Sequence, residues 1–94
     1  MIVRILAEGQ WRIDEALRSE LNTLDDAVEK AVAADDEAGL SVALHELLEK
    51  VRNAGEPVGD AELLDSDLIL PDADATLDEV RALLDESEGG LVPN

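Results

Sequence analysis

Two runs of apolar residues at helical spacing, joined by three consecutive acids, constrain the fold of this 94-residue chain more than any other feature. The first run consists of Leu17, Leu21, Leu24, Val28 and Val32. The second run consists of Leu40, Leu44, Leu47, Leu48 and Val51. Because side chains three and four residues apart share one face of a helix, both runs predict amphipathic helices. We expect them over residues 14–34 and 37–54, packed as an αα-hairpin.

Residues with known capping preferences mark the ends of these two helices. Asp14 can cap the first helix, because its carboxylate accepts hydrogen bonds from free backbone N–H groups. The acids at 35–37 offer a cap for the second helix and place negative charge at its N-terminus, where the helix dipole favours it. Gly55, followed closely by Pro57, provides a stop. The turn between the helices is therefore expected to be short.

The C-terminal third contains one further helix signal. Thr76 stands three residues before Glu79, which is the spacing of a capping box, and apolar residues follow it at helical spacing. A short helix over 77–86 is expected. The acidic connection 55–75 that precedes it contains one apolar patch, Leu68-Ile69-Leu70, which we expect to form a short strand or a buried extended segment.

The N-terminal residues 2–13 have the pattern of a β-hairpin, with two apolar, β-branched segments around a central glycine, Gly9. A two-residue turn at Glu8-Gly9 would place Arg4 among the apolar side chains. A three-residue loop with Gly9 in a left-handed conformation instead gives one apolar face and one mixed face. The apolar face would contain Val3, Ile5, Ala7, Trp11 and Ile13, and the other face Arg4, Leu6 and Arg12. We favour this second register.

These elements together predict a single α+β domain over residues 1–94. Its N-terminal β-hairpin packs on an αα-hairpin, followed by a short extended segment and a short C-terminal helix. Two strands alone are marginally stable, so the hairpin must lean on the helices or pair with another strand. Residues 91–93 are expected either to add a few strand residues or to fray.

The net charge of −17 bears on partners more than on the fold. Residues 55–94 carry twelve acids against Arg81 alone, a net charge of −11. Such a field repels nucleic-acid phosphates and anionic lipid, so no direct contact with either is expected. A basic protein partner fits better. Alternatively, the acids only maintain solubility, for instance in a cytosol of high salt.

Few residues have the types or spacing that catalysis or metal binding requires. His45 is the only histidine, and no nucleophile motif accompanies it. An EF-hand loop starting at Asp72 would put Leu77 where glycine is needed and Leu83 where glutamate is needed, so that match fails. No cysteine and no glycine-rich phosphate loop is present. We expect no catalytic, cofactor or metal site, and the lack of cysteine fits a reducing cytoplasm.

Four segments carry a resemblance to a known family. They are MIVRILAEGQWRID at the start, the paired helices LNTLDDAVEKAV and LSVALHELLEKVRNAGEPV, and SDLILPDADATLDEVRALL near the end. In order and spacing they resemble the PspA-associated protein family, PspAA, over residues 1–92. That family is found beside PspA, the phage-shock coiled-coil protein that binds and maintains stressed inner membranes. The resemblance implies a cytoplasmic accessory or regulatory protein without an active site, recruited to the inner face of the cell membrane by its partner.

The resemblance supplies no contact residues, so candidates come from this sequence alone. Acidic helix faces suit basic stretches of a partner, and an apolar edge around Trp11 suits the centre of an interface. The partner-binding candidates are Trp11, Arg12, Asp25, Asp26 and Glu29. Trp11 is equally well explained as a core residue. A homo-oligomer is also open, through pairing of the hairpin edge or through the leucine stripes.

A different class of function competes with the adaptor hypothesis. Carboxylates can imitate phosphates, so an acidic protein of this size can act as a nucleic-acid mimic that inhibits a DNA-binding protein. This alternative predicts capture of transcription factors or nucleases instead of a coiled coil.

Overall fold

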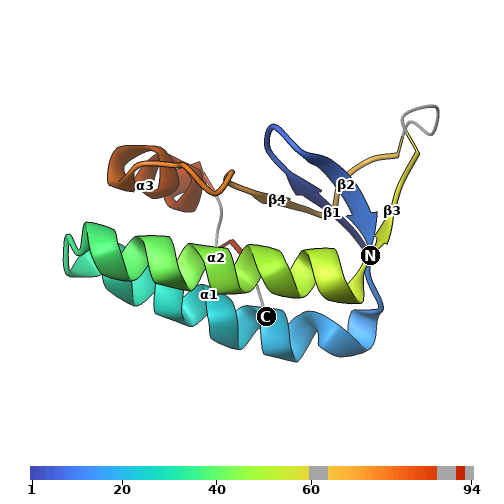
Figure 1. The fold of residues 1–94 in the computed structure, drawn as a ribbon, viewed down its shortest axis with the longest axis horizontal. Coiled ribbons are helices and arrows are strands. Elements are labelled where there is room, and N and C mark those ends of the chain that lie inside the picture. Colours follow the sequence, from blue (N-terminus) through green and yellow to red (C-terminus); the bar gives the residue numbers. More distant parts are fainter. Residues whose placement is uncertain (60–63, 87–90, 93–94) are drawn as a thin grey trace.

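The computed structural model describes residues 1–59, 64–86 and 91–92 (Figure 1). The strands are β1 (Ile2–Ile5), β2 (Gly9–Arg12), β3 (Glu56–Pro57) and β4 (Leu68–Leu70). The helices are the 3₁₀ turn η1 (Glu15–Leu17), α1 (Arg18–Ala33), α2 (Glu37–Ala54) and α3 (Leu77–Glu86). The sheet and α3 lie side by side over the antiparallel pair of α1 and α2 (Figure 1). The expected α+β fold class is confirmed.

The sheet has the strand order β3-β2-β1-β4 and is mixed. β1 and β2 form the N-terminal hairpin, β3 extends it antiparallel to β2, and β4 lies parallel to β1 on the other side. The hairpin therefore packs against the helices and also pairs with another strand at each of its two edges. Because β4 comes from the apolar patch at 68–70, a segment far away in sequence completes the sheet.

The register of the hairpin differs from the expected one. Val3 pairs with Trp11 and Ile5 with Gly9, so the three loop residues are 6–8 instead of the 8–10 expected from placing Gly9 in the loop. Ala7 lies in this loop with a φ of 69°, whereas Gly9 begins β2 with a φ of 133°. The expectation that Ala7 belongs to the apolar face was wrong. The division of the strands into faces holds nevertheless, because the two registers differ by an even number of residues.

Side-chain caps define the helix starts. Asp14 Oδ1 accepts from the Ala16 N–H at 3.0 Å and caps η1, so the first helix begins as a 3₁₀ turn before α1. Asp36 Oδ1 accepts from the Gly39 N–H at 3.0 Å and caps α2. At α3, Thr76 Oγ1 accepts from the Glu79 N–H at 3.2 Å and donates to the Glu79 carboxylate, which is the capping box.

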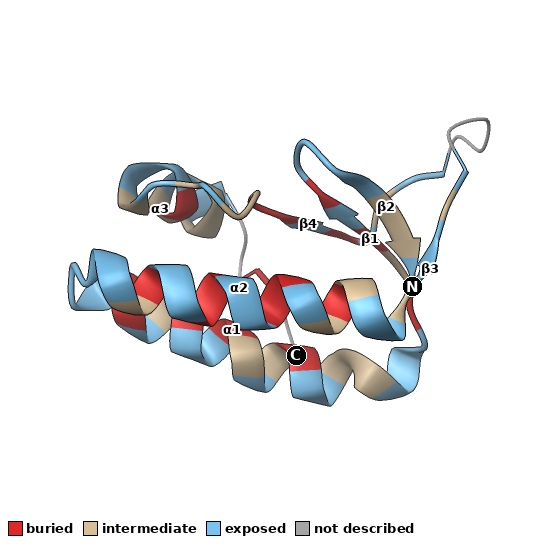
Figure 2. Cartoon of the chain, viewed as in Figure 1, coloured by how far each residue is buried: buried red, intermediate tan, exposed pale blue. Residues whose placement is uncertain are grey.

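The core lies between the sheet and the helix pair (Figure 2). Its innermost part is aliphatic and consists of Val3, Ile5, Val28, Leu44, Leu47, Leu48, Val51, Leu70, Val80 and Val92. Leu91 and Val92 are buried here and are not part of a strand. Residues 91 and 92 therefore pack in the core, and both expectations for them, added strand residues or a frayed end, were wrong. Pro93, the third residue of that expectation, lies outside the described residues.

Gly55 provides a test of how closely the end of α2 approaches the sheet. A Cβ at this position would meet the Val51 carbonyl oxygen at 2.8 Å and the Trp11 Cβ at 3.0 Å. We expect Gly55→Ala to lower the free energy of unfolding by about 1–3 kcal/mol, because backbone and core must shift. Gly59→Ala is the control, since nothing lies within 4 Å of its Cβ. Urea unfolding of both variants measures the difference, and equal losses would contradict the close approach.

Candidate functional site

The sequence-predicted contact residues lie on two elements. Trp11 and Arg12 are neighbours on β2, whereas Asp26 and Glu29 lie on α1. Trp11 shares the inner face of the sheet with its register partner Val3 and is half-buried against the core. Arg12 is exposed on the outer face. Asp26 is exposed and Glu29 is half-buried, so the structure leaves these four residues accessible in part, but on different surfaces.

Asp25, the fifth candidate, is completely buried. Its Oδ2 accepts a hydrogen bond of 3.1 Å from the Val92 N–H, and the neighbouring Asn22 side chain donates to the Val92 carbonyl oxygen. Asp25 Oδ1 is also buried and has no hydrogen-bond partner within the described ranges. The expectation that Asp25 contacts a partner is therefore corrected: this carboxyl holds the C-terminal segment against α1.

Burial raises the pKa of the Asp25 carboxyl from 3.8 to about 6. The hydrogen bond from the Val92 N–H and the nearby Leu91 backbone oppose this change, and the negative charges of Glu29 and Asp26 add to it. Asp25 is thus an acid whose charged form is disfavoured in the folded protein. The apolar spacing of α1 does not reveal it, because Asp25 lies next in sequence to Leu24 and carries a polar side chain on the buried face.

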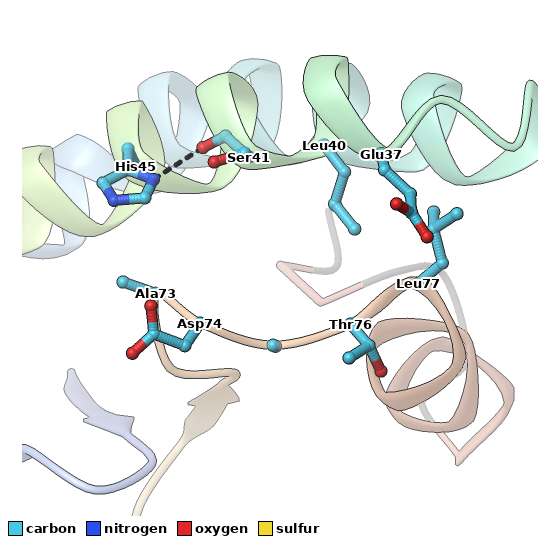
Figure 3. A pocket seen from close by; sticks show the side chains of 9 residues that line it. Glu37, Leu40, Ser41, His45, Ala73, Asp74, Thr76 and Leu77 are labelled. Carbon is cyan, nitrogen blue, oxygen red and sulfur yellow. Dashed lines mark hydrogen bonds between the residues drawn. The ribbon is translucent and has the colours of Figure 1, made fainter.

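A pocket of about 280 Å³ lies between α2 and the segment that leads into α3 (Figure 3). Its residues are Glu37, Leu40, Ser41, His45, Ala73, Asp74, Ala75, Thr76 and Leu77. His45 Nδ1 donates to the Ser41 carbonyl oxygen at 2.7 Å, which leaves Nε2 as the free ring nitrogen. Among the residues that the structure describes, no hydrogen bond or ion pair joins His45 to Asp74. The Thr76 hydroxyl is engaged in the cap of α3.

The same pocket lacks the side-chain arrangement of a metal site. Within the described ranges, no group of three or more His, Asp or Glu residues is close enough to hold a metal ion. The pocket therefore offers scattered polar groups, with no paired nucleophile and base.

A wider groove, of about 590 Å³, runs between α1 and α2. Small side chains dominate it, including Ala27, Ala31 and Ala34, while Lys30 and Val42 lie at its sides. Val42 is 61% exposed. The sequence analysis anticipated that two helices and a hairpin leave some apolar edge uncovered, and this groove is one such edge.

Within the described residues, no helix covers the outer face of the sheet (Figure 1). Figure 1 shows the helices on the opposite face only. Arg4 pairs in register with Ile69 on β4, and both side chains are exposed. Sequence reasoning placed Arg4 and Leu6 on this face but did not single it out. The exposed aliphatic Ile69 was missed because its parallel pairing with β1 has no local sequence signal.

Fold and surface together define a class: a small acidic α+β domain that presents faces without a covering helix on its sheet and on its helix pair. The model of the PspA-Associated protein family, PspAA, matches the whole of residues 1–94. The chain belongs to this family. Neither the search of curated proteins nor the search of solved structures found a significant match. Across the described part of the chain, no helix is both long and apolar enough to span a membrane.

Proposed function

We propose that this protein is a non-enzymatic accessory or regulatory protein that binds a PspA-like coiled-coil protein in the membrane-stress, or phage-shock, response. The single observation that carries the proposal is the family match over residues 1–94, since the family is defined by association with PspA. The proposed place of action is the cytoplasm, with recruitment to the inner face of the membrane through the partner.

The charge of the chain supports a division of labour at the interface. A net charge of −17 creates a long-range field that speeds and orients the approach of a basic stretch on the partner. Asp26 and Glu29 on α1 are candidate contributors, and Trp11 and Arg12 on β2 are candidate short-range contacts. Because Trp11 also packs against the core, its replacement tests stability together with binding.

A tagged pull-down from the native cytosol, at low and moderate salt, tests the proposal directly. We expect a PspA-like coiled coil as the dominant protein identified by mass spectrometry. Recovery of DNA-binding proteins with no coiled coil would instead support a nucleic-acid mimic and would overturn the adaptor role.

Salt provides a second, kinetic prediction. If the acidic field steers association, the association rate constant with the purified coiled coil should fall several-fold as salt rises from low to moderate concentration, because the field is screened beyond about 10 Å. The dissociation rate constant should change less. Surface-based kinetics at several salt concentrations measures both. An association rate independent of salt would remove electrostatic steering from the proposal.

A further inference from the structure

Arg4 and Ile69 are exposed register partners on the outer face of the sheet, Leu6 is exposed just after β1, and Leu64 is exposed in the segment before β4. These four residues are here called the Arg4 patch. Arg4 on β1 has the register partners Ile69 on β4 and Gln10 on β2. Leu6 follows two residues after Arg4. The Gln10 side chain donates to the Leu64 carbonyl oxygen at 2.8 Å, which places Leu64 beside the same strands.

The patch concentrates aliphatic surface. Of the four large aliphatic side chains that the described residues expose, three belong to it: Leu6 at 37%, Leu64 at 36% and Ile69 at 47%. The fourth is Val42 in the α1–α2 groove. Exposed aliphatic residues are ordinary when scattered, but a cluster of them marks an interaction surface.

Arg4, like Lys30, lacks the acidic partner that several other cations in the described part of the chain have. Arg52 pairs with Glu8 and Glu49, and Arg81 pairs with Asp35. Arg4 makes no ion pair with any residue in the described part of the chain, although the chain contains 24 acids. A guanidinium set among aliphatic side chains is open to a carboxylate from outside, which it can bind through two hydrogen bonds.

The surrounding field limits where a carboxylate of a partner can bind. Most of the molecule repels carboxylates, so a partner's carboxylate is accepted only beside a cation that has no acidic partner of its own. A helix can lie on the open face of a sheet as a third layer. Coiled-coil helices commonly carry glutamates beside their apolar positions, which suits an arginine flanked by leucine and isoleucine.

We infer that the Arg4 patch docks an amphipathic helix of the coiled-coil partner, with a single glutamate of that helix on Arg4 and aliphatic side chains on Leu6 and Ile69. This inference rests on the proposed function and adds the surface and the chemistry of the contact. A second copy of this chain fits less well, because each copy brings a net charge of −17. The α1–α2 groove fits less well because its lining is mostly small and Val42 is its one large exposed aliphatic residue.

Two matched pairs of variants separate the patch from the groove. Arg4→Glu and Lys30→Glu change the net charge equally, and neither cation has an ion pair within the described ranges. Ile69→Ala and Val42→Ala each remove exposed aliphatic surface, on the sheet and on α2 respectively. The probe is the purified PspA-type coiled coil from the same organism, and calorimetry gives the affinity. Circular dichroism melting verifies that each variant is folded.

We expect Arg4→Glu to weaken binding by about tenfold or more and Ile69→Ala by about fivefold, with both control variants within about twofold of the wild type. Equal losses for Arg4→Glu and Lys30→Glu would overturn the inference while leaving the proposed function standing. Losses confined to Lys30→Glu and Val42→Ala would overturn it in favour of the groove. A wild type that binds no coiled coil would remove the proposed function and this inference together. If light scattering shows a self-association that Arg4→Glu abolishes, the occupant is a second copy and the inference is overturned.

Discussion

Above about pH 7, Asp25→Asn should raise the free energy of unfolding by about 3 kcal/mol, because the wild type must keep a buried carboxylate charged there. The folded-state pKa of Asp25 is raised from 3.8 to about 6 by burial. The stability that the protonated Asp25 side chain contributes is therefore fully present below its unfolded-state pKa of 3.8. This stability is lost as the pH rises through the folded-state pKa of about 6. Asparagine has no charge to bury and can still accept the hydrogen bond from the Val92 N–H.

The stability difference between Asp25→Asn and the wild type should consequently shrink toward zero as the pH falls to about 4. Urea unfolding across this range measures it, and the other acids cancel in the difference. Asp26→Asn is the matched control, since it removes the same charge from the adjacent, exposed position, and it should stay within about 0.5 kcal/mol of the wild type. A difference for Asp25→Asn that does not vary with pH would contradict the buried, raised-pKa carboxyl.

Leu91→Ala should lower the free energy of unfolding by about 2–5 kcal/mol, the range for a leucine deleted from a packed core. Leu91 is only 2% exposed, and its neighbour Val92 is completely buried. The substitution leaves a cavity beside α1 and weakens the anchoring of the C-terminal segment. Equilibrium unfolding in urea at neutral pH measures the loss.

Leu64→Ala is the control for this second prediction, because it deletes the same atoms from a side chain that is 36% exposed. Its effect should remain below about 1 kcal/mol. Similar losses for the two variants would mean that residues 91–92 do not form part of the core in solution. They would then fray, as the sequence alone allowed.

Local sequence signals were sufficient for the helices and for their caps. Leu40, Leu44 and Leu47 recur once per helical turn, and Thr76 and Glu79 of the capping box are three residues apart. Such signals depend on contacts close in sequence, so the chain reveals them without its fold. The alternation in β1 likewise sorted Val3 and Ile5 from Arg4, since strand faces follow from odd and even positions.

The candidate site was less accessible to the same reasoning. Asp25 has the sequence context of an exposed acid, but in the fold it is completely buried and accepts a hydrogen bond from Val92 in the C-terminal segment. The apolar neighbours of Ile69 in the sequence are typical of a buried strand. Its parallel pairing with Arg4 of β1 instead places Ile69 on the exposed face of the sheet. Both contacts join residues about 65 apart in the chain, and no local pattern encodes which distant segments meet.

The sequence by itself thus determined the α+β class, the helix pair, the caps and the two faces of the hairpin. The tertiary structure decided the loop register around Ala7, the addition of β3 and β4, and the burial of Asp25 by Val92. The physical reason is the range of the interactions. Helix periodicity and capping act over three or four residues, whereas sheet pairing and core burial are set by competition among distant segments for the same apolar surface.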